Sequence, residues 1–309
     1  MPSCLGKTLI IANPAAQNGN GAAAAEKAGR LLTASLGEDA PTIVVTEGAR
    51  HAEEIAAQAR DVTSVIALGG DGVAHEVANG LMRLPAETRP ALGLIPVGSG
   101  NDYARTIGMT CDVDRACAQL LASVPRPADI GSVNGRYFVE TLSFGLDAAI
   151  ALDTVERRKR TGRTGTILYI EAGINQLLHH LTVGRYTASF DGGPAIAGES
   201  ITFAVQIGPT YGSGFVICPE ARIDDGLFDM CIAHPPVSVQ RAILIFALAK
   251  SGRHTVFKQM EFLRAHTLHV EFDEAPPAQT DGEPLEGRIF DIQVESSALN
   301  VLMPTPLPS

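Results

Sequence analysis

The sequence SVIALGGDGVAHEV, residues Ser64–Val77, passes from an apolar strand through a Gly-Gly-Asp-Gly turn into an amphipathic helix. Glycine has no Cβ, so a ligand can come close to the backbone of this turn. The helix that follows adds unpaired N–H groups and the positive end of its dipole, which favour a phosphate group. Asp71 would repel a bare phosphate, so it indicates a bound Mg²⁺ or a proton acceptor. These features predict a nucleotide phosphoryl-transfer site.

Apolar strands alternate with helical stretches through the first third of the chain. The expected strands are Thr8–Ala12, Thr42–Thr46, Val62–Leu68 and Ala91–Pro96, and the expected helices are Ala22–Leu36, Ala52–Arg60, Val73–Leu84, one from Asn101 and Val113–Ser123. This alternation predicts an α/β domain, a parallel sheet with helices on both faces. Ligands bind such sheets beyond the carboxyl ends of the strands, where the glycine loops of this chain lie.

A second glycine loop, Gly98-Ser99-Gly100-Asn101, follows the strand Ala91–Pro96 and opens another helix. The Ser99 hydroxyl can donate to a phosphate, and Asn101 can cap the helix. Taken alone, the loop could equally be a structural turn. Two such loops after neighbouring strands favour a nucleotide site.

Polar residues near the other strand ends have two interpretations each. Asn13 opens a loop after the first strand, which is either part of the nucleotide site or a plain connection to the next helix. The Thr46 hydroxyl could contact nucleotide or cap a helix. His75 follows the glycine turn closely enough to border the nucleotide, but we rank it below the carboxylates.

The composition changes near Pro125-Arg126-Pro127, and short alternating runs follow. The expected strands are Gly135–Phe144, Gly184–Asp191, Glu199–Ile207, Leu227–Ala233 and Thr267–Phe272, with helices around Ile167–Leu181 and Val239–Lys250. Gly, Pro and Asp turns separate these runs. The pattern predicts an antiparallel, β-rich and sandwich-like second domain.

Bulk properties exclude several classes of protein. A length of 309 residues favours two domains, and a net charge of −10 argues against a nucleic-acid-binding surface. Five cysteines without paired spacing indicate neither structural zinc nor a disulfide framework, which fits a reducing cytoplasm. The N-terminal apolar run is too short for a signal peptide, and Ala242–Ala249 is too short to span a bilayer.

Several motifs in order resemble those of the soluble bacterial diacylglycerol kinase family. They are Asn13-Pro14, Gly69-Gly70-Asp71-Gly72, Pro96–Asp102, Tyr211–Gly214, Asp224–Asp229 and Asp281-Gly282-Glu283. This family is related to sphingosine and ceramide kinases and, more distantly, to NAD kinases. The resemblance covers nearly the whole chain. It implies an ATP-binding domain over residues 1–127, completed by residues 288–309, and a lipid-substrate domain over residues 128–287.

The resemblance also implies roles for individual residues. Glu283 would be the general base that takes the proton of a lipid hydroxyl, although Asp281-Gly282-Glu283 alone could be a surface turn. Asp71 would hold the catalytic Mg²⁺ or compete for the base role. A second Mg²⁺ would lie on Asp225 with the backbone of Arg222 and Leu227, unless this segment is only a hairpin turn. The nucleotide would contact Asn13, Thr46, Gly69, Gly70, Asp71, Gly72, Val73, His75, Glu76, Gly98, Ser99, Gly100, Asn101 and Asp281.

Three positions depart from the family pattern. Val73 stands where a threonine is usual and removes a hydroxyl that could touch phosphate, Ser99 replaces another threonine, and Glu140 replaces an asparagine. The basic run Arg157–Arg163 is either a solvated helix end or a contact for anionic headgroups.

The sequence therefore predicts an ATP- and Mg²⁺-dependent lipid kinase, with diacylglycerol as the acceptor. The alternatives are an NAD kinase, a sphingoid or ceramide-type kinase, and a nucleotide-binding regulator that lost turnover through Val73. The expected location is cytoplasmic, with transient contact at the inner face of the membrane and no nucleic-acid partner. A homodimer is compatible with the sequence.

Overall fold

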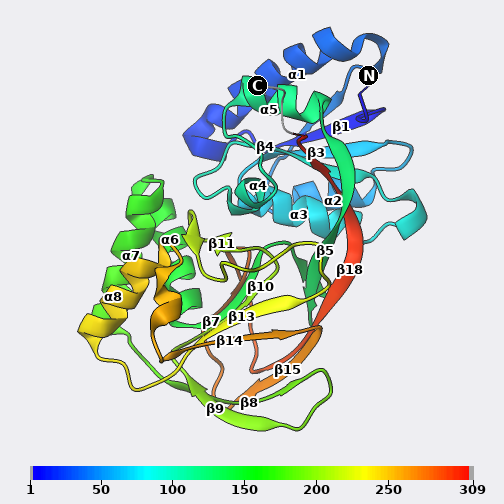
Figure 1. The fold of residues 1–309 in the computed structure, drawn as a ribbon. Helices are drawn as coiled ribbons and strands as arrows, with labels where there is room; N and C mark the ends of the chain where they lie inside the picture. The colour runs from blue at the N-terminus through cyan, green and yellow to red at the C-terminus, as the bar shows by residue number, and fades with distance from the viewer. Residues whose placement is uncertain (1–2, 306–309) are drawn as a thin grey trace. The chain divides into compact units, whose positions relative to one another are not determined.

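The computed structural model describes residues 3–305, and the chain separates into two compact units (Figure 1). The first unit comprises Met1–Ala128 together with Ser297–Ser309, and the second is Asp129–Ser296. Each unit has its own sheet arrangement and its own core.

The first unit is built on a parallel sheet with the strand order β2-β1-β3-β4. Its strands are β1 (Thr8–Ala12), β2 (Thr42–Val45), β3 (Ser64–Gly69) and β4 (Ala91–Pro96). Its helices are α1 (Ala16–Leu36), α2 (His51–Ala57), α3 (Asp71–Leu81), α4 (Asp102–Thr106) and α5 (Val113–Leu121), with the 3₁₀ turns η1 (Gly37–Asp39) and η2 (Ala86–Thr88). The end of β18 (Ile289–Met303) adds a parallel strand, with Val301 opposite Leu92.

The central strands β3 and β4 are buried along their whole length. Strands covered by helices on both faces have continuous apolar sequences instead of alternating ones, as these two have. Gly69 lies opposite Pro96, so the two strands end at the same level and their loops begin side by side. The predicted parallel α/β domain is confirmed.

The second unit contains two large antiparallel sheets and one short two-stranded sheet. One has the order β14-β13-β10-β7-β16-β17, and in the other the first half of β18 is followed by β15, β8 and β9, with β5 and β6 attached to β18. The strands are β5 (Val124–Val133), β6 (Arg136–Phe138), β7 (Thr141–Gly145), β8 (Gly184–Phe190), β9 (Ile196–Ser200), β10 (Thr202–Gln206), β11 (Thr210–Tyr211), β12 (Phe215–Val216), β13 (Phe228–Ala233), β14 (Met260–Ala265), β15 (Thr267–Phe272), β16 (Ala278–Thr280) and β17 (Glu283–Pro284). The predicted antiparallel β-rich domain is confirmed.

Aromatic side chains fill the core of this second unit. The Phe144 ring on β7 lies 4.7 Å from the Phe290 ring and 5.1 Å from the Phe272 ring, measured between centroids. Phe290 and Phe272 belong to the other sheet, so these contacts join the two layers. Helices α6 (Leu146–Thr161), α7 (Thr166–His179) and α8 (Val239–Ala249) pack on one another beside the sheets, followed by η3 (Arg253–Val256) (Figure 1).

Several boundaries differ from the sequence-based expectation. No helix was predicted over Leu146–Thr161, because the charged second half of α6 hides its short apolar face. The helix α1 begins at Ala16 instead of Ala22, although residues 17–19 have positive φ and interrupt it. The expected strand Gly135–Phe144 is divided into β6 and β7. Within residues 3–305, no helix has the length and apolar composition needed to cross a bilayer.

Candidate active site

The two glycine loops of the first unit touch through their backbones. A Cβ added to Gly98 would lie 2.4 Å from the Cα of Gly70, and one added to Gly100 would lie 2.5 Å from the Asp71 carboxylate. No side chain can be accommodated at these distances. Gly98 and Gly100 are therefore required for the loops after β3 and β4 to meet.

Asp71 ties the first loop to the second. One carboxylate oxygen accepts a hydrogen bond from the Asn101 N–H at 2.7 Å, and the other accepts from the Asp102 N–H at 2.8 Å. The Asn101 side chain closes its own loop, because it accepts from the Gly98 N–H and donates to the Gly98 carbonyl, both at 2.8 Å. Asn101 has φ of 55°, which asparagine adopts more readily than most residues. These bonds hold both loops in one conformation.

The tied loops leave backbone donors available. Within residues 3–305, the N–H groups of Gly72, Ser99 and Gly100 donate no hydrogen bond to another residue. A small hollow here is lined by Gly69, Gly70, Asp71, Pro96 and Asn101, with Ala67, Ala74, Leu94 and Ala104 behind them. Converging N–H groups at a helix start are the donors that a phosphate needs, so the local geometry fits the phosphates of a nucleotide.

The structure gives other predicted nucleotide contacts local structural roles. The Asn13 side chain accepts from the Ala15 N–H at 2.9 Å and shapes the turn into α1. The buried Thr46 donates its N–H to the Ala12 carbonyl at 2.8 Å, as a continuation of the sheet. Both residues still lie just beyond the carboxyl ends of their strands.

Three residues of α3 face the protein interior or a neighbouring helix. Val73 packs on Gly69, and a Cβ at Gly69 would lie 2.7 Å from the valine Cγ2. His75 is buried, and its Nε2 lies 3.3 Å from the Asn79 amide nitrogen. The Glu76 carboxylate accepts hydrogen bonds from the first N–H groups around α2 at 2.9 and 3.1 Å. The side chains of these three residues therefore contact other parts of the first unit and support the start of α3.

In the second unit, Asp281 and Gly282 form a two-residue turn between β16 and β17. Their φ values are 49° and 92°, the left-handed pair that makes Asp-Gly a preferred hairpin turn. The Asp281 carboxylate accepts hydrogen bonds from the N–H groups of Val139, Glu140 and Thr141 at 2.8 to 3.0 Å. It thus fixes the segment that leads into β7.

Glu283 follows this turn and has a different environment. It pairs with Thr280 through the hairpin, and its side chain is exposed. No hydrogen bond or ion pair within residues 3–305 engages its carboxylate. Of the two acids in Asp281-Gly282-Glu283, Glu283 is the one that can accept a proton without breaking the local structure.

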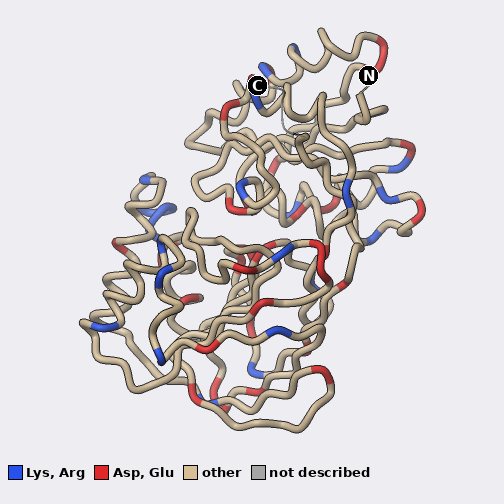
Figure 2. The backbone as a smooth tube through the Cα atoms, viewed as in Figure 1, with Lys and Arg blue, Asp and Glu red and all other residues tan. Residues whose placement is uncertain are grey.

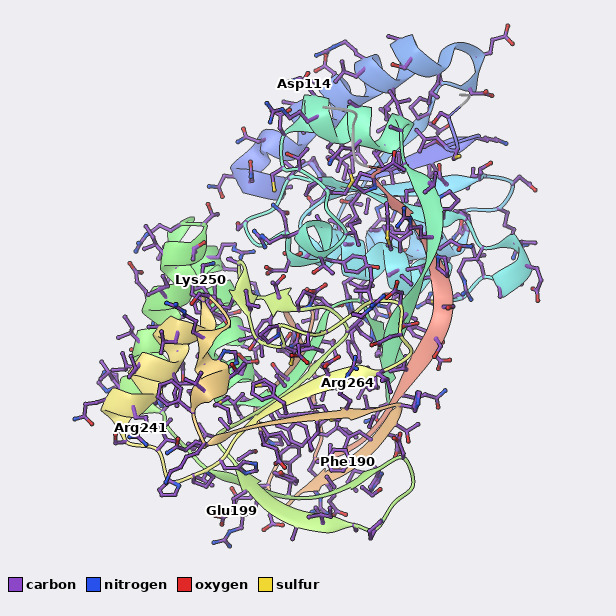
Figure 3. All side chains as sticks on the ribbon, in the orientation of Figure 1. Asp114, Phe190, Glu199, Arg241, Lys250 and Arg264 are labelled. Carbon is purple, nitrogen blue, oxygen red and sulfur yellow. The ribbon has the colours of Figure 1, made fainter. Side chains whose placement is uncertain are left out.

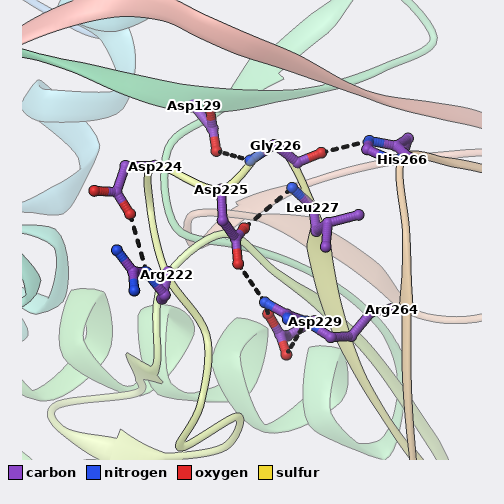
Figure 4. Close-up of polar contacts among 9 residues, drawn as sticks. All are labelled: Asp129, Arg222, Asp224, Asp225, Gly226, Leu227, Asp229, Arg264 and His266. Atoms are coloured by element: carbon purple, nitrogen blue, oxygen red, sulfur yellow. Dashed lines mark hydrogen bonds and ion pairs between the residues drawn. The ribbon is translucent and has the colours of Figure 1, made fainter.

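The predicted second metal position is a turn held by protein groups (Figure 4). The Asp225 carboxylate accepts from the Leu227 N–H at 3.2 Å and forms an ion pair with Arg264. Arg264 also contacts Asp229 at 3.1 Å. The Arg222 guanidinium pairs with Asp224 at 3.2 Å.

A Mg²⁺ ion does not fit the Asp225 turn as the residues stand. Hard cations need several oxygen ligands, and here the guanidinium of Arg264 already neutralises the Asp225 carboxylate. Residues 3–305 contain no group of three or more His, Cys, Asp or Glu side chains arranged to hold a metal ion. Asp129 and His266 further fasten the turn through the Gly226 N–H and carbonyl, both at 2.7 Å.

Sequence reasoning missed a row of buried polar side chains on β10, β7 and β16. Gln206 donates to the Thr141 hydroxyl at 2.6 Å, and Gln279 donates to the Ser143 hydroxyl at 2.8 Å. Asp147, at the start of α6, hydrogen-bonds with Ser143, and burial raises its pKa from 3.8 to about 7. The alternation along β7, with Thr141 and Ser143 on one face and Leu142 and Phe144 on the other, is the only sequence signal for this row.

Comparison with known proteins places both units in one family. Residues 7–133 match the model of the diacylglycerol kinase catalytic domain, and residues 140–303 match the YegS C-terminal NAD kinase beta sandwich-like domain. The chain belongs to the diacylglycerol kinase family of lipid kinases. It is 32% identical over 255 residues to a "Probable lipid kinase YegS-like" of Pseudomonas aeruginosa, covering 82% of this chain and 80% of the relative.

A second sequence relative and two solved structures are also similar to this chain. A diacylglycerol kinase of Bacillus subtilis is 32% identical over 236 residues, covering 76% of this chain and 75% of the relative. A crystal structure of a diacylglycerol kinase from Bacillus anthracis has a TM-score of 0.78 at 24% identity and 97% coverage of both chains. An NAD kinase from Archaeoglobus fulgidus has a TM-score of 0.51 at 11% identity, covering 96% of this chain and 93% of that one. These two structures show a shared fold.

Proposed function

We propose that this lipid kinase transfers the γ-phosphate of Mg²⁺-ATP to the free hydroxyl of diacylglycerol and so forms phosphatidic acid. The single observation that carries the proposal is the pair of glycine loops held together by Asp71, with the N–H groups of Gly72, Ser99 and Gly100 left to donate. Because the donor is ATP and the acceptor is a bilayer lipid, the proposed place of action is the cytoplasmic face of the membrane.

We assign nucleotide binding to the first unit. Backbone donors hold the phosphates without adding charge, and the glycines allow the close approach that this requires. Asp71 lies beside these donors at the start of α3, and a carboxylate oxygen is a ligand type that Mg²⁺ prefers, so Asp71 would hold the Mg²⁺ of the nucleotide. The ion, when bound, neutralises charge on the phosphates.

We propose that the second unit supplies the residue that accepts the proton of the lipid hydroxyl. The lipid hydroxyl oxygen forms a bond to the γ-phosphorus, the bond from that phosphorus to the β–γ bridging oxygen breaks, and ADP leaves. The hydroxyl proton passes to the Glu283 carboxylate. Asp281 is proposed to position Glu283 through its three backbone hydrogen bonds.

The test of the mechanism compares Glu283→Gln with Glu286→Gln, another exposed glutamate three residues further along. Radiolabelled ATP and dispersed diacylglycerol give kcat, and nucleotide binding is measured separately by calorimetry. Glu283→Gln should lower kcat by roughly 10²- to 10⁴-fold and leave ATP affinity unchanged, whereas Glu286→Gln should behave as wild type. Full activity of Glu283→Gln would refute the assignment of the base.

The acceptor is tested by offering diacylglycerol, sphingosine, ceramide and NAD in parallel to the same preparation. Labelled phosphatidic acid as the main product supports the proposal. Labelling of another lipid would correct the acceptor, and labelling of NAD alone would overturn the assignment to a lipid. ATP binding without transfer to any acceptor would indicate a regulator.

A further inference from the structure

The exposed face of helix α7 is almost entirely apolar. Between Thr166 and Leu178 the exposed side chains are Ile167, Ile170, Ile174 and Leu178, with exposed fractions of 66, 37, 40 and 51%. Their spacing of three and four residues places them in one stripe along the helix. The opposite face, with Tyr169, Ala172 and Leu177, is buried in the core of the helical layer. The helix is therefore apolar on both faces, and only one is covered.

Helix α8 extends this apolar surface. It packs closely on α7, because a Cβ at Gly173 would lie 2.3 Å from the ring of Phe246. Leu244 of α8 is half exposed, and no acidic residue occurs from Val239 to Arg253. Arg241 and Lys250 stand at the two ends of this helix (Figure 3).

Basic residues gather at the end of α6 (Figure 2). From Arg157 to Val183 the sequence has five Lys or Arg residues and one acidic residue, a formal net charge of +4 in a chain of −10. Arg157, Lys159 and Arg163 form ion pairs with neighbouring acids. Within residues 3–305, Arg158 and Arg160 form none.

We propose that these three helices dock on an anionic lipid bilayer. The proposed docking face combines the exposed apolar side chains Ile167, Ile170, Ile174, Leu178 and Leu244 with the exposed basic side chains Arg158 and Arg160. Helices that lie in the membrane interface combine an apolar stripe, which enters the acyl boundary, with Lys or Arg near the headgroups. The proposal rests on the proposed function in one respect, since a kinase of a bilayer lipid must reach the bilayer.

Charge favours a bilayer over a second copy of the chain as the occupant. A stable interface between copies pairs charges of opposite sign around its apolar centre. The docking face offers cations, and the one acidic side chain in its stretch of α7, Glu171, is already paired with Arg163. Two such faces would bring cations against cations, whereas anionic headgroups would neutralise them.

The test is sedimentation with vesicles of phosphatidylcholine and phosphatidylglycerol, without nucleotide or diacylglycerol. Ile167→Glu/Ile174→Glu should lower the partition coefficient tenfold or more. The matched control is Ile196→Glu/Ile289→Glu, because these two isoleucines are 57 and 42% exposed on strands β9 and β18 of the same unit. The control should bind as wild type. Circular dichroism melting checks that both double variants are folded.

A second pair of variants isolates charge. Arg158→Gln/Arg160→Gln and Arg185→Gln/Arg288→Gln each lower the net charge by two. The second pair changes Arg185 of β8 and Arg288, the residue before β18, which form ion pairs with Glu199 and Glu271. The first pair should weaken binding to anionic vesicles about 30-fold, roughly fivefold for each basic residue near the surface. The second should leave binding unchanged, and neither should affect vesicles of phosphatidylcholine alone.

Wild-type binding by Ile167→Glu/Ile174→Glu would overturn the proposal. So would a wild-type dimer, seen by analytical ultracentrifugation, that this variant dissociates while vesicle binding persists, since a second copy would then cover the face. Activity on a short-chain diacylglycerol dispersed in solution separates docking from catalysis. Vesicle binding without any such activity would refute the proposed function alone, and activity without vesicle binding would refute the docking face alone.

Discussion

The buried carboxyl of Asp147 makes the stability of the second unit depend on pH. Asp147 lies in the first turn of α6, 7% exposed, and its Oδ2 has no hydrogen-bond partner within residues 3–305. Burial disfavours the charged form and raises the pKa from 3.8 to about 7, while the hydrogen bond with Ser143 acts in the opposite direction. Replacing Asp147 by Asn removes the ionisation and nearly preserves the shape.

The sign and size of the effect follow from linkage. The folded state holds its proton more tightly than the unfolded state, so the folded state is favoured below pH 4 and loses this advantage as the pH rises to about 7. A shift of about three pH units corresponds to about 4 kcal/mol. The positive end of α6 offsets about 1 kcal/mol of it. Asp147→Asn should therefore be more stable than wild type by about 3 kcal/mol at pH 8 and by less than about 1 kcal/mol at pH 4.

Guanidinium unfolding of both proteins, followed by circular dichroism at pH 4, 6 and 8, measures this difference. Comparison at equal pH cancels the contribution of the other carboxylates, which the two proteins share. Asp224→Asn, an exposed aspartate, is the control and should show a constant difference. Parallel stability curves for wild type and Asp147→Asn across this pH range would refute the reasoning.

Three further substitutions test the loops and turns. Gly98→Ala should weaken ATP binding roughly tenfold to hundredfold in calorimetry, because its Cβ would displace the backbone of the neighbouring loop. Asp281→Ala should lower the free energy of unfolding by about 2–4 kcal/mol in denaturant titrations, because three backbone N–H groups lose their acceptor. Arg264→Gln should cost about 1 kcal/mol in the same assay, because Asp225 and Asp229 lose the cation that lies between their carboxylates.

The loop substitution has a matched control, and two further results would contradict the roles assigned to Asp281 and to the Asp225 turn. Gly48→Ala adds a methyl group where nothing lies within 4 Å, so it should bind ATP as wild type, and equal binding by Gly98→Ala would contradict the loop contact. An Asp281→Ala protein as stable as wild type would show that water replaces its carboxylate. If Mg²⁺ alone stabilised the wild type and did not stabilise Asp225→Asn, the conclusion that Mg²⁺ does not fit the Asp225 turn would be wrong.

Local patterns predicted much of the first unit. Apolar runs ending in glycine and followed by amphipathic helices predict parallel strands and their loops, because strand, turn and helix preferences act over a few residues. The change of pattern near Pro125-Arg126-Pro127 also predicted the division of the chain into an α/β part and a β-rich part. Helix α6 was missed except for its charged end, because its amphipathic face is short.

The order of motifs along the chain also predicted the lipid kinase family, which the comparisons confirm. The resemblance implied separate roles for Asp71, Asp281 and Glu283, but the residues by themselves left Asp281-Gly282-Glu283 open as a surface turn. Asp71 and Asp281 bind backbone N–H groups that lie at least thirty residues away in the sequence, whereas the Glu283 carboxylate binds none among residues 3–305. Contacts of this kind depend on how distant segments meet, and no local preference encodes them.

The sequence by itself determined where glycine, acid and apolar residues recur, and hence the fold class and the position of the nucleotide loops. Tertiary structure alone decided which of those residues are buried. The sequence does not distinguish an isoleucine that faces the core, such as Ile150, from one that faces solvent, such as Ile167. The difference arises only when neighbouring elements cover one face of a helix and leave the other open, because burial is a property of the packed chain.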